Sequence, residues 1–135
     1  MPTYAACSLH PSSMSPTAYV VDPDPEERKW IETTLSPSVE AVRSLDDAEA
    51  LLAVLGVRKG ACLIISVEPD EAAALELVRE LRLSGSNIPV IAVGSGTAFR
   101  TATEIVRLDF TDFLERPLTA HKLRAAVKCA CAAWK

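Results

Sequence analysis

Four residues that could contribute to a chemical site each follow a short, largely apolar run of the sequence. These residues are Asp22, Ser66, Gly94 and Arg116. The runs that precede them are residues 17–21, 61–65, 89–93 and 113–115. Only Asp22 carries a carboxylate, the kind of oxygen ligand that hard cations such as Mg²⁺ prefer. Ser66 adds a hydroxyl group, and the planar guanidinium of Arg116 suits a bidentate carboxylate.

Ser66 is the member of this set that could be a nucleophile. A serine nucleophile needs a base within hydrogen-bonding reach and a site for an oxyanion. The two histidines are His10, in a leading segment, and His121, in the expected last helix, so neither is a natural base. We therefore expect Ser66 to be a buried serine that is hydrogen-bonded at the end of a strand, and we do not expect an enzyme.

Two further interactions are conceivable at these strand ends. Residues 94–96 read Gly-Ser-Gly, and the backbone amides of such a loop could bind an anion. The segment lacks the remaining residues of a P-loop and its lysine, so we expect a flexible loop before the next helix. For Arg116 we hypothesise a salt bridge to Asp22 or Asp24 across the pocket, against the alternative of a solvated surface arginine.

The elements that must position these residues follow from the apolar pattern. Strands are expected at the four runs above and at residues 39–43, and helices at residues 26–35, after residue 46, at residues 70–83 and 99–108, and after Thr119. Strands that alternate with helices demand right-handed crossovers and a doubly wound α/β fold with a parallel sheet. In such a sheet the ligand crevice lies outside the carboxyl ends of the strands, where the four residues should meet.

Two of the expected helices carry apolar faces. In the helix at residues 26–35, Trp30, Ile31 and Leu35 recur at helical spacing and should form its buried stripe. The last helix carries Leu123 and Val127 toward the core, and its apolar stripe continues to Trp134. Trp134 could anchor a dimer, since tryptophan is enriched at interface hot spots, or could cap the core.

Length and composition describe one domain of ordinary size. The 135 residues are 49% hydrophobic, which is enough for a well-covered core. The net charge of -4 and the scattered basic residues give no basic field for a phosphate backbone, so we expect no direct nucleic-acid binding. No apolar run approaches the length of a membrane span, and we expect a cytoplasmic protein. Residues 1–16 are rich in Ser, Pro and Thr and predict a disordered leader before a domain at residues 17–135, with Met1 or Met14 as the natural start.

Three segments of the sequence form a recognisable set in their order and spacing. They are YVVDPDP at residues 19–25, IPVIAV at residues 88–93 and TDFLERPL at residues 111–118. Together they resemble the receiver domain of two-component response regulators, and the last two look like the transcription-factor branch of that family. The resemblance covers about residues 17–135. It implies the CheY-like, flavodoxin-like (βα)5 fold, with a five-stranded parallel sheet in the order 2-1-3-4-5.

The resemblance also shows where this chain departs from a working receiver. Such a receiver needs two adjacent acids after the first strand, an aspartate ending the third, Ser or Thr ending the fourth, and Lys-Pro after the fifth. The acids hold Mg²⁺, which draws a phosphoryl group onto the aspartate, and the hydroxyl and lysine bind the phosphoryl oxygens. This chain retains Asp22 and Pro117. At the other positions it has Pro23 for the second acid, Ser66 for the phosphorylated aspartate, Gly94 for the hydroxyl residue and Arg116 for the lysine.

These departures predict a degenerate phosphoacceptor pocket. Mg²⁺ prefers near-octahedral oxygen coordination, and Asp22 with the backbone carbonyl of Glu68 is a poor starting set, so we expect no cofactor and weak or no Mg²⁺ binding. Ser66 cannot form an acyl phosphate. We expect an atypical pseudo-receiver of bacterial two-component (phosphorelay) signal transduction. The alternatives are a receiver phosphorylated on a neighbouring acid, Asp24 or Glu68, and a small-ligand sensor that uses the vacated pocket.

The resemblance implies partner surfaces as well. Phe113 stands where the family has its switch aromatic, and plain core packing is the competing interpretation. The family often pairs with itself or with partners through its fourth helix, fifth strand and fifth helix. We therefore expect a signalling protein or a histidine-kinase-related protein as partner, or a homodimer through this face. The interface candidates are Ile105, Leu108, Leu123, Val127 and Trp134.

Overall fold

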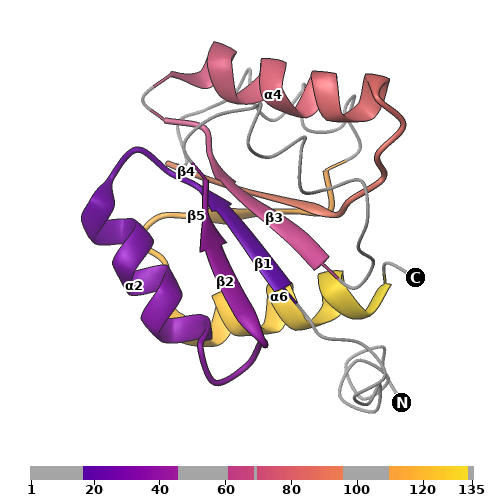
Figure 1. The fold of residues 1–135 in the computed structure, drawn as a ribbon. Helices are drawn as coiled ribbons and strands as arrows, with labels where there is room; N and C mark the ends of the chain where they lie inside the picture. The colour runs from indigo at the N-terminus through magenta and orange to yellow at the C-terminus, as the bar shows by residue number, and fades with distance from the viewer. Residues whose placement is uncertain (1–16, 46–60, 69, 96–109, 134–135) are drawn as a thin grey trace.

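A five-stranded parallel sheet forms the centre of the computed structural model, which describes residues 17–45, 61–68, 70–95 and 110–133 (Figure 1). The strands are β1 (Thr17–Val21), β2 (Ala41–Ser44), β3 (Ala61–Ser66), β4 (Val90–Gly94) and β5 (Asp112–Glu115). The helices are α2 (Pro25–Leu35), α4 (Glu71–Leu83) and α6 (Ala120–Ala133). All neighbouring strands are parallel, and their order is β2-β1-β3-β4-β5. The predicted fold class and strand order are confirmed.

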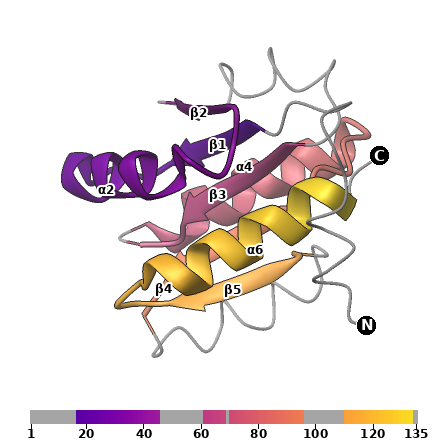
Figure 2. The same cartoon turned by 90° about the horizontal axis from the view of Figure 1, so that it is seen from below.

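Helices cover both faces of the sheet. Figure 1 shows α4 on one face and α2 with α6 on the other, and Figure 2, seen from the side of α6, shows that helix lying in front of the strands. Successive side chains of a strand point to opposite faces, so β3 sends Ile64 to the core beneath α2 and α6. Its neighbours Leu63 and Ile65 join the core beneath α4. All six residues of β3 are buried, as expected for a central strand covered on both sides.

The start of α2 is set by the loop after β1. Asp24 is the N-cap, and its Oδ1 accepts a hydrogen bond from the amide of Glu26 at 3.0 Å. Pro25 occupies the first turn, where its missing N–H would have no helical partner in any case. Glu26 and Glu27 place carboxylates in that turn, where they complement the helix dipole. The second of these, Glu27, therefore lies beside the carboxyl end of the sheet.

The predicted buried stripe of α2 is correct for Ile31 and Leu35 and wrong for Trp30. Ile31 and Leu35 are fully buried, whereas Trp30 is 37% exposed. Adjacent residues of a helix point about 100° apart, so Trp30 and Ile31 do not share one face. Thr34 is the residue that completes the buried side of this helix.

Thr119 caps α6, because its Oγ1 accepts a hydrogen bond from the amide of Lys122 at 3.3 Å. Leu123 and Val127 are both 0% exposed and belong to the core beneath α2 and α6. The interface assignment of these two residues is therefore wrong, since neither side chain reaches the surface. Ile105, Leu108 and Trp134 lie outside the described residues, as do the expected helices after residue 46 and at residues 99–108.

The observed element bounds differ from the expected ones by one or two residues. The second strand begins at Ala41 rather than at residue 39, and β4 extends to Gly94. In α4, Asp70 is the N-cap and Leu81 completes the buried face, while Arg82 turns back to the carbonyl oxygen of Ile88 at 2.8 Å. Among the described residues, none of the helices has the length and apolar character of a membrane span.

Candidate functional site

The parallel register brings the predicted strand-end residues to one edge of the sheet. Ser66 pairs with Val93 across β3 and β4, and Gly94 pairs with Glu115 across β4 and β5. Arg116 follows β5 directly, and its amide donates to the carbonyl oxygen of Gly94 at 2.8 Å. Asp22 follows β1, whose last residue lies opposite Ile65 of β3. The edge predicted from sequence therefore exists, and Ser66, Gly94, Arg116 and Asp22 all lie at it.

The Arg116 guanidinium pairs with Glu27, the carboxylate in the first turn of α2. Arg116 Nη2 lies 2.6 Å from Glu27 Oε1, and Arg116 Nε lies 3.1 Å from Glu27 Oε2. Such a two-bond arrangement matches the planar fork of arginine to both oxygens of one carboxylate. The side chains are only 26% and 16% exposed, so the ion pair is partly withdrawn from water.

The predicted partners of Arg116 were Asp22 and Asp24, and this prediction is wrong. Within the described part of the chain, no ion pair joins Arg116 to either aspartate. Both are occupied by backbone amides, because Asp22 Oδ1 accepts from the amide of Asp24 at 2.9 Å and Asp24 Oδ1 accepts from the amide of Glu26. Glu27, which the sequence-based prediction missed, lies three residues after Asp24 in the first turn of α2 and has a longer side chain than aspartate.

Glu68, in the loop after β3, is the second carboxylate of this site. Its Oε1 accepts from Arg116 Nη1 at 2.6 Å and from the amide of Ser95 at 3.2 Å. Its Oε2 accepts from the hydroxyl of Ser95 at 2.6 Å. Ser95 belongs to the loop whose amides the sequence suggested as a possible anion site, and the group that its amide and hydroxyl bind is the Glu68 carboxylate, which was not anticipated.

Ser66 is buried at the end of β3, with 7% of its surface exposed. Its hydroxyl donates to the backbone carbonyl oxygen of Glu68 at 2.8 Å and accepts from Arg116 Nη2 at 2.9 Å. The amide of Glu68 adds a longer contact to the same oxygen at 3.3 Å. This arrangement agrees with the expectation of a buried serine hydrogen-bonded at a strand end. The geometry gives Ser66 an arginine as neighbour, which cannot serve as a base because it stays protonated.

The backbone at Gly94 leaves no room for a side chain. A Cβ atom at this position would lie 2.7 Å from Cγ2 of Val67 and 3.5 Å from the ring of Phe113. Val67 is almost fully buried, and Phe113 is half-buried against the same core. Phe113 therefore packs in the core beneath α4 in this conformation. At position 94, where the resemblance implies a Ser or Thr, the space that a side chain would enter is occupied by Val67.

The pKa values of Asp22, which follows β1, and Glu27, in the first turn of α2, are shifted in opposite directions. The pKa of Asp22 is raised to about 7 by burial and by its hydrogen bond to Glu27, against the opposing effects of the Asp24 amide and Arg116. Burial also raises the pKa of Glu27, but hydrogen bonds from Arg116 and Asp22 lower it more, so the net pKa lies below its ordinary value. Below its pKa of about 7, Asp22 is the protonated member of this pair and can donate to the Glu27 carboxylate that bonds to Arg116.

The donor set at this edge does not fit Mg²⁺. Within the described ranges, no three His, Cys, Asp or Glu residues are placed to hold a metal ion together. The Glu68 carbonyl, which the sequence suggested as a ligand, accepts the Ser66 hydroxyl, and Pro23 offers no side-chain oxygen. The Arg116 guanidinium lies between Glu27 and Glu68 and adds a positive charge where the cation would need negative ones.

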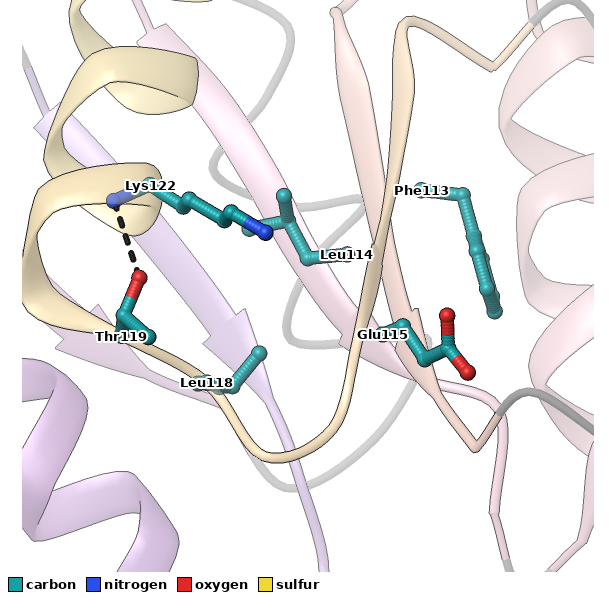
Figure 3. A pocket seen from close by; sticks show the side chains of 6 residues that line it. All are labelled: Phe113, Leu114, Glu115, Leu118, Thr119 and Lys122. Carbon is teal, nitrogen blue, oxygen red and sulfur yellow. Dashed lines mark hydrogen bonds between the residues drawn. The ribbon is translucent and has the colours of Figure 1, made fainter.

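A pocket is lined by β5, by the turn that follows it and by the start of α6 (Figure 3). Its volume is about 210 Å³, and its lining residues are Phe113, Leu114, Glu115, Leu118, Thr119 and Lys122. Figure 3 shows Leu114 and Lys122 on one side of β5 and Phe113 with Glu115 on the other. Between β5 and α6 runs the turn that contains Pro117, which is joined to Arg116 by a cis peptide bond.

Comparisons with known proteins agree with this architecture. Residues 18–128 match the response regulator receiver domain. The transcriptional regulatory protein FixJ of Bradyrhizobium diazoefficiens is 27% identical over 112 residues, which are 83% of this chain and 55% of that protein. FixJ of Azorhizobium caulinodans is 30% identical over 113 residues, with 83% and 53% covered. The chain thus spans about half the length of the curated relatives it matches.

Solved structures show the same likeness. The crystal structure of FixJ-N superimposes with a TM-score of 0.75 at 27% identity, and 87% of this chain and 94% of that chain are covered. A response regulator receiver protein from Pseudoalteromonas atlantica gives a TM-score of 0.72 at 26% identity, with 83% and 93% covered. The resemblance seen in the sequence, including its transcription-factor branch, is confirmed. By its match over residues 18–128 and its sheet order, the chain belongs to the response regulator receiver domain family.

Proposed function

We propose that this chain is an atypical receiver that does not accept a phosphoryl group and acts in two-component signalling through protein contacts. It is not an enzyme in this proposal, and it works in the bacterial cytoplasm. Its fold and family are those of signalling domains, while its strand-end pocket has lost the groups that phosphotransfer needs. The partner is a signalling protein or a histidine-kinase-related protein.

The observation that carries the proposal is the position of the Arg116 guanidinium. It donates to Glu27, to Glu68 and to the hydroxyl of Ser66, the residue in the place of the phosphorylated aspartate. A phosphoryl donor would have to displace these bonds to approach position 66. Ser66 would also have to act without a base and without a well-coordinated metal ion. We propose that Mg²⁺ binding at this edge is weak or absent for the same reason.

We do not favour the alternative of a ligand sensor in a vacated pocket, because the Arg116 guanidinium and two carboxylates bond to one another at the strand ends. The alternative of phosphorylation on Asp24 or Glu68 is also disfavoured. Asp24 caps α2, and Glu68 already accepts three hydrogen bonds.

Incubation with Mg²⁺ and acetyl phosphate, followed by intact mass measurement, tests the proposal. We expect no added phosphoryl mass on the wild-type chain, while an unrelated working receiver treated in parallel gains it. A phosphoryl adduct mapped to Asp24 or Glu68 would overturn the proposal in favour of the phosphorelay alternative. An adduct at Ser66 would overturn it as well.

Partner binding is proposed for the face around β5 and the start of α6. This face carries the exposed residues Asp112, Glu115 and Lys122 and the pocket of Figure 3, while Leu123 and Val127 pack beneath it. A homodimer through this face is one form of the proposal. Light scattering of the wild type and of a Glu115→Lys, Lys122→Glu variant tests it, and an unchanged dimer in the variant would exclude this face.

A further inference from the structure

The Glu68 carboxylate is held by three donors that come from two other loops. Arg116 Nη1, after β5, donates to Oε1 at 2.6 Å, and the Ser95 amide, after β4, donates to the same oxygen at 3.2 Å. The Ser95 hydroxyl donates to Oε2 at 2.6 Å. A backbone amide, a hydroxyl and a guanidinium converging on one anionic group make an oxyanion site, whichever molecule supplies the oxyanion.

Neutralising the charge of Arg116 does not by itself require the Glu68 carboxylate. Arg116 is already paired with both oxygens of Glu27. Glu68 is also the more exposed of the two acids, at 40% of its side chain against 16% for Glu27. An exposed ion pair alone contributes little to stability. Glu68 differs from Glu27 in that it also accepts hydrogen bonds from the amide and the hydroxyl of Ser95. It therefore links the loop after β4 to Arg116, which follows β5.

We propose that Glu68 is a built-in ligand of this domain. Its carboxylate occupies an oxyanion site made by the Ser95 amide, the Ser95 hydroxyl and Arg116, and so holds the loops after β3, β4 and β5 together without an external anion. The inference rests on the proposed function, because a domain that receives no phosphoryl group needs another anion to join these loops. The ligand class of the emptied site is a small carboxylate.

Chemical rescue of a Glu68→Ala variant tests this inference. The substitution removes a CH₂–COO⁻ group and leaves the three donors in place, and acetate matches the removed group in size and charge. We expect the variant to lose about 4 °C in Tm relative to the wild type. Acetate should restore most of this loss in a saturable manner, because a ligand that binds only the folded state raises Tm. Sodium chloride at the same ionic strength controls for screening.

Two control variants make the result specific. Glu76→Ala removes a glutamate of α4 that forms a single exposed pair with Arg79 at 2.9 Å, and acetate should leave its Tm unchanged. Glu68→Gln keeps the size of the side chain and fills the site with a neutral amide, so acetate should not stabilise it. The Gln variant also preserves the test if Glu68→Ala proves too unstable to measure, since it should lose Tm without rescue.

Three outcomes would overturn the inference. These are an unchanged Tm in Glu68→Ala and Glu68→Gln, equal acetate effects on wild type and Glu68→Ala, and a rescue that chloride reproduces. The proposed function fails by a different measurement, namely a phosphoryl adduct on the wild-type chain. The two failures are therefore distinguishable, because rescue by acetate reports on the anion site and intact mass reports on phosphotransfer.

Discussion

Arg116 and Glu27, 89 residues apart in the sequence, form a two-bond ion pair that joins the end of β5 to the first turn of α2. The same guanidinium reaches Ser66, which ends β3, and Glu68, which follows it, so one side chain joins the end of β3 to the first turn of α2.

Arg116→Ala should destabilise the domain by about 2–3 kcal/mol, because it leaves the largely buried Glu27 carboxylate without its partner. Arg116→Lys should recover only part of the loss, since a single ammonium cannot make the bidentate contact. Urea unfolding of both variants measures the difference. Arg79→Ala, which removes an exposed pair on α4, is the matched control and should cost no more than about 0.5 kcal/mol. Equal effects of Arg116→Ala and Arg79→Ala would show that the site adds nothing.

Asp22 should make the stability of the domain depend on pH between about 4 and 7. Its folded-state pKa is raised to about 7 from an ordinary value of 3.8, so in this range the folded state binds the extra proton. The Asp22 contribution is therefore favourable at low pH and is lost as the pH rises toward the folded pKa. The lowered pKa of Glu27 acts in the opposite sense, since its contribution is present above its ordinary pKa and is lost at more acid pH.

An Asp22→Asn variant isolates this effect, because asparagine is neutral at every pH and can still donate to Glu27. Urea unfolding at pH 5 and pH 8 should show that the variant gains about 2–3 kcal/mol relative to wild type between the two values. A constant difference between the two proteins at pH 5 and pH 8 would contradict a raised pKa for Asp22.

Gly94→Ala should cost about 1–3 kcal/mol, because the new Cβ would lie 2.7 Å from Cγ2 of Val67 in a close-packed core. Combining it with Val67→Ala should remove most of the clash, so the double variant should be more stable than the sum of the single effects predicts. Thermal or urea unfolding of the four proteins gives this coupling directly. Additive effects would show that the backbone shifts to make room instead.

Ser66→Asp alone should not restore efficient phosphorylation. The new carboxylate would lie beside Arg116, and the second acid, the hydroxyl at position 94 and the lysine would still be absent. Intact mass after treatment with Mg²⁺ and acetyl phosphate checks this expectation. Rapid phosphorylation of the single variant would mean that the changes at Pro23, Gly94 and Arg116 matter less than the geometry indicates.

The sheet could be predicted because its information is local. Each apolar run of strand length is followed by a turn or helix signal, and the continuous run that became β3 specifies a strand buried on both faces. The strand-end residues were also predictable, because parallel strands bring their carboxyl ends to one edge. Only the element bounds shifted, by one or two residues.

The site contacts were less predictable because they depend on side-chain reach in three dimensions. Arg116 was expected to meet Asp22 or Asp24, but both serve backbone amides, and Glu27 is presented by the helix that Asp24 caps. The sequence signal available for this contact was a glutamate in the first turn of α2, the helix that follows β1. Trp30 was misplaced because it sits next to Ile31, and the spacing of Ile31 and Leu35 alone defines the buried face.

Cγ2 of Val67 lies very close to the place that a Cβ atom of residue 94 would take, so the order in which positions 67 and 94 are substituted matters. A side chain fits at position 94 only after residue 67 has become smaller. Enlarging residue 94 first gives an overpacked intermediate. The effects of substitutions at positions 67 and 94 are thus coupled, even though a one-base change converts glycine to serine. The two positions should therefore vary together among descendants of this chain.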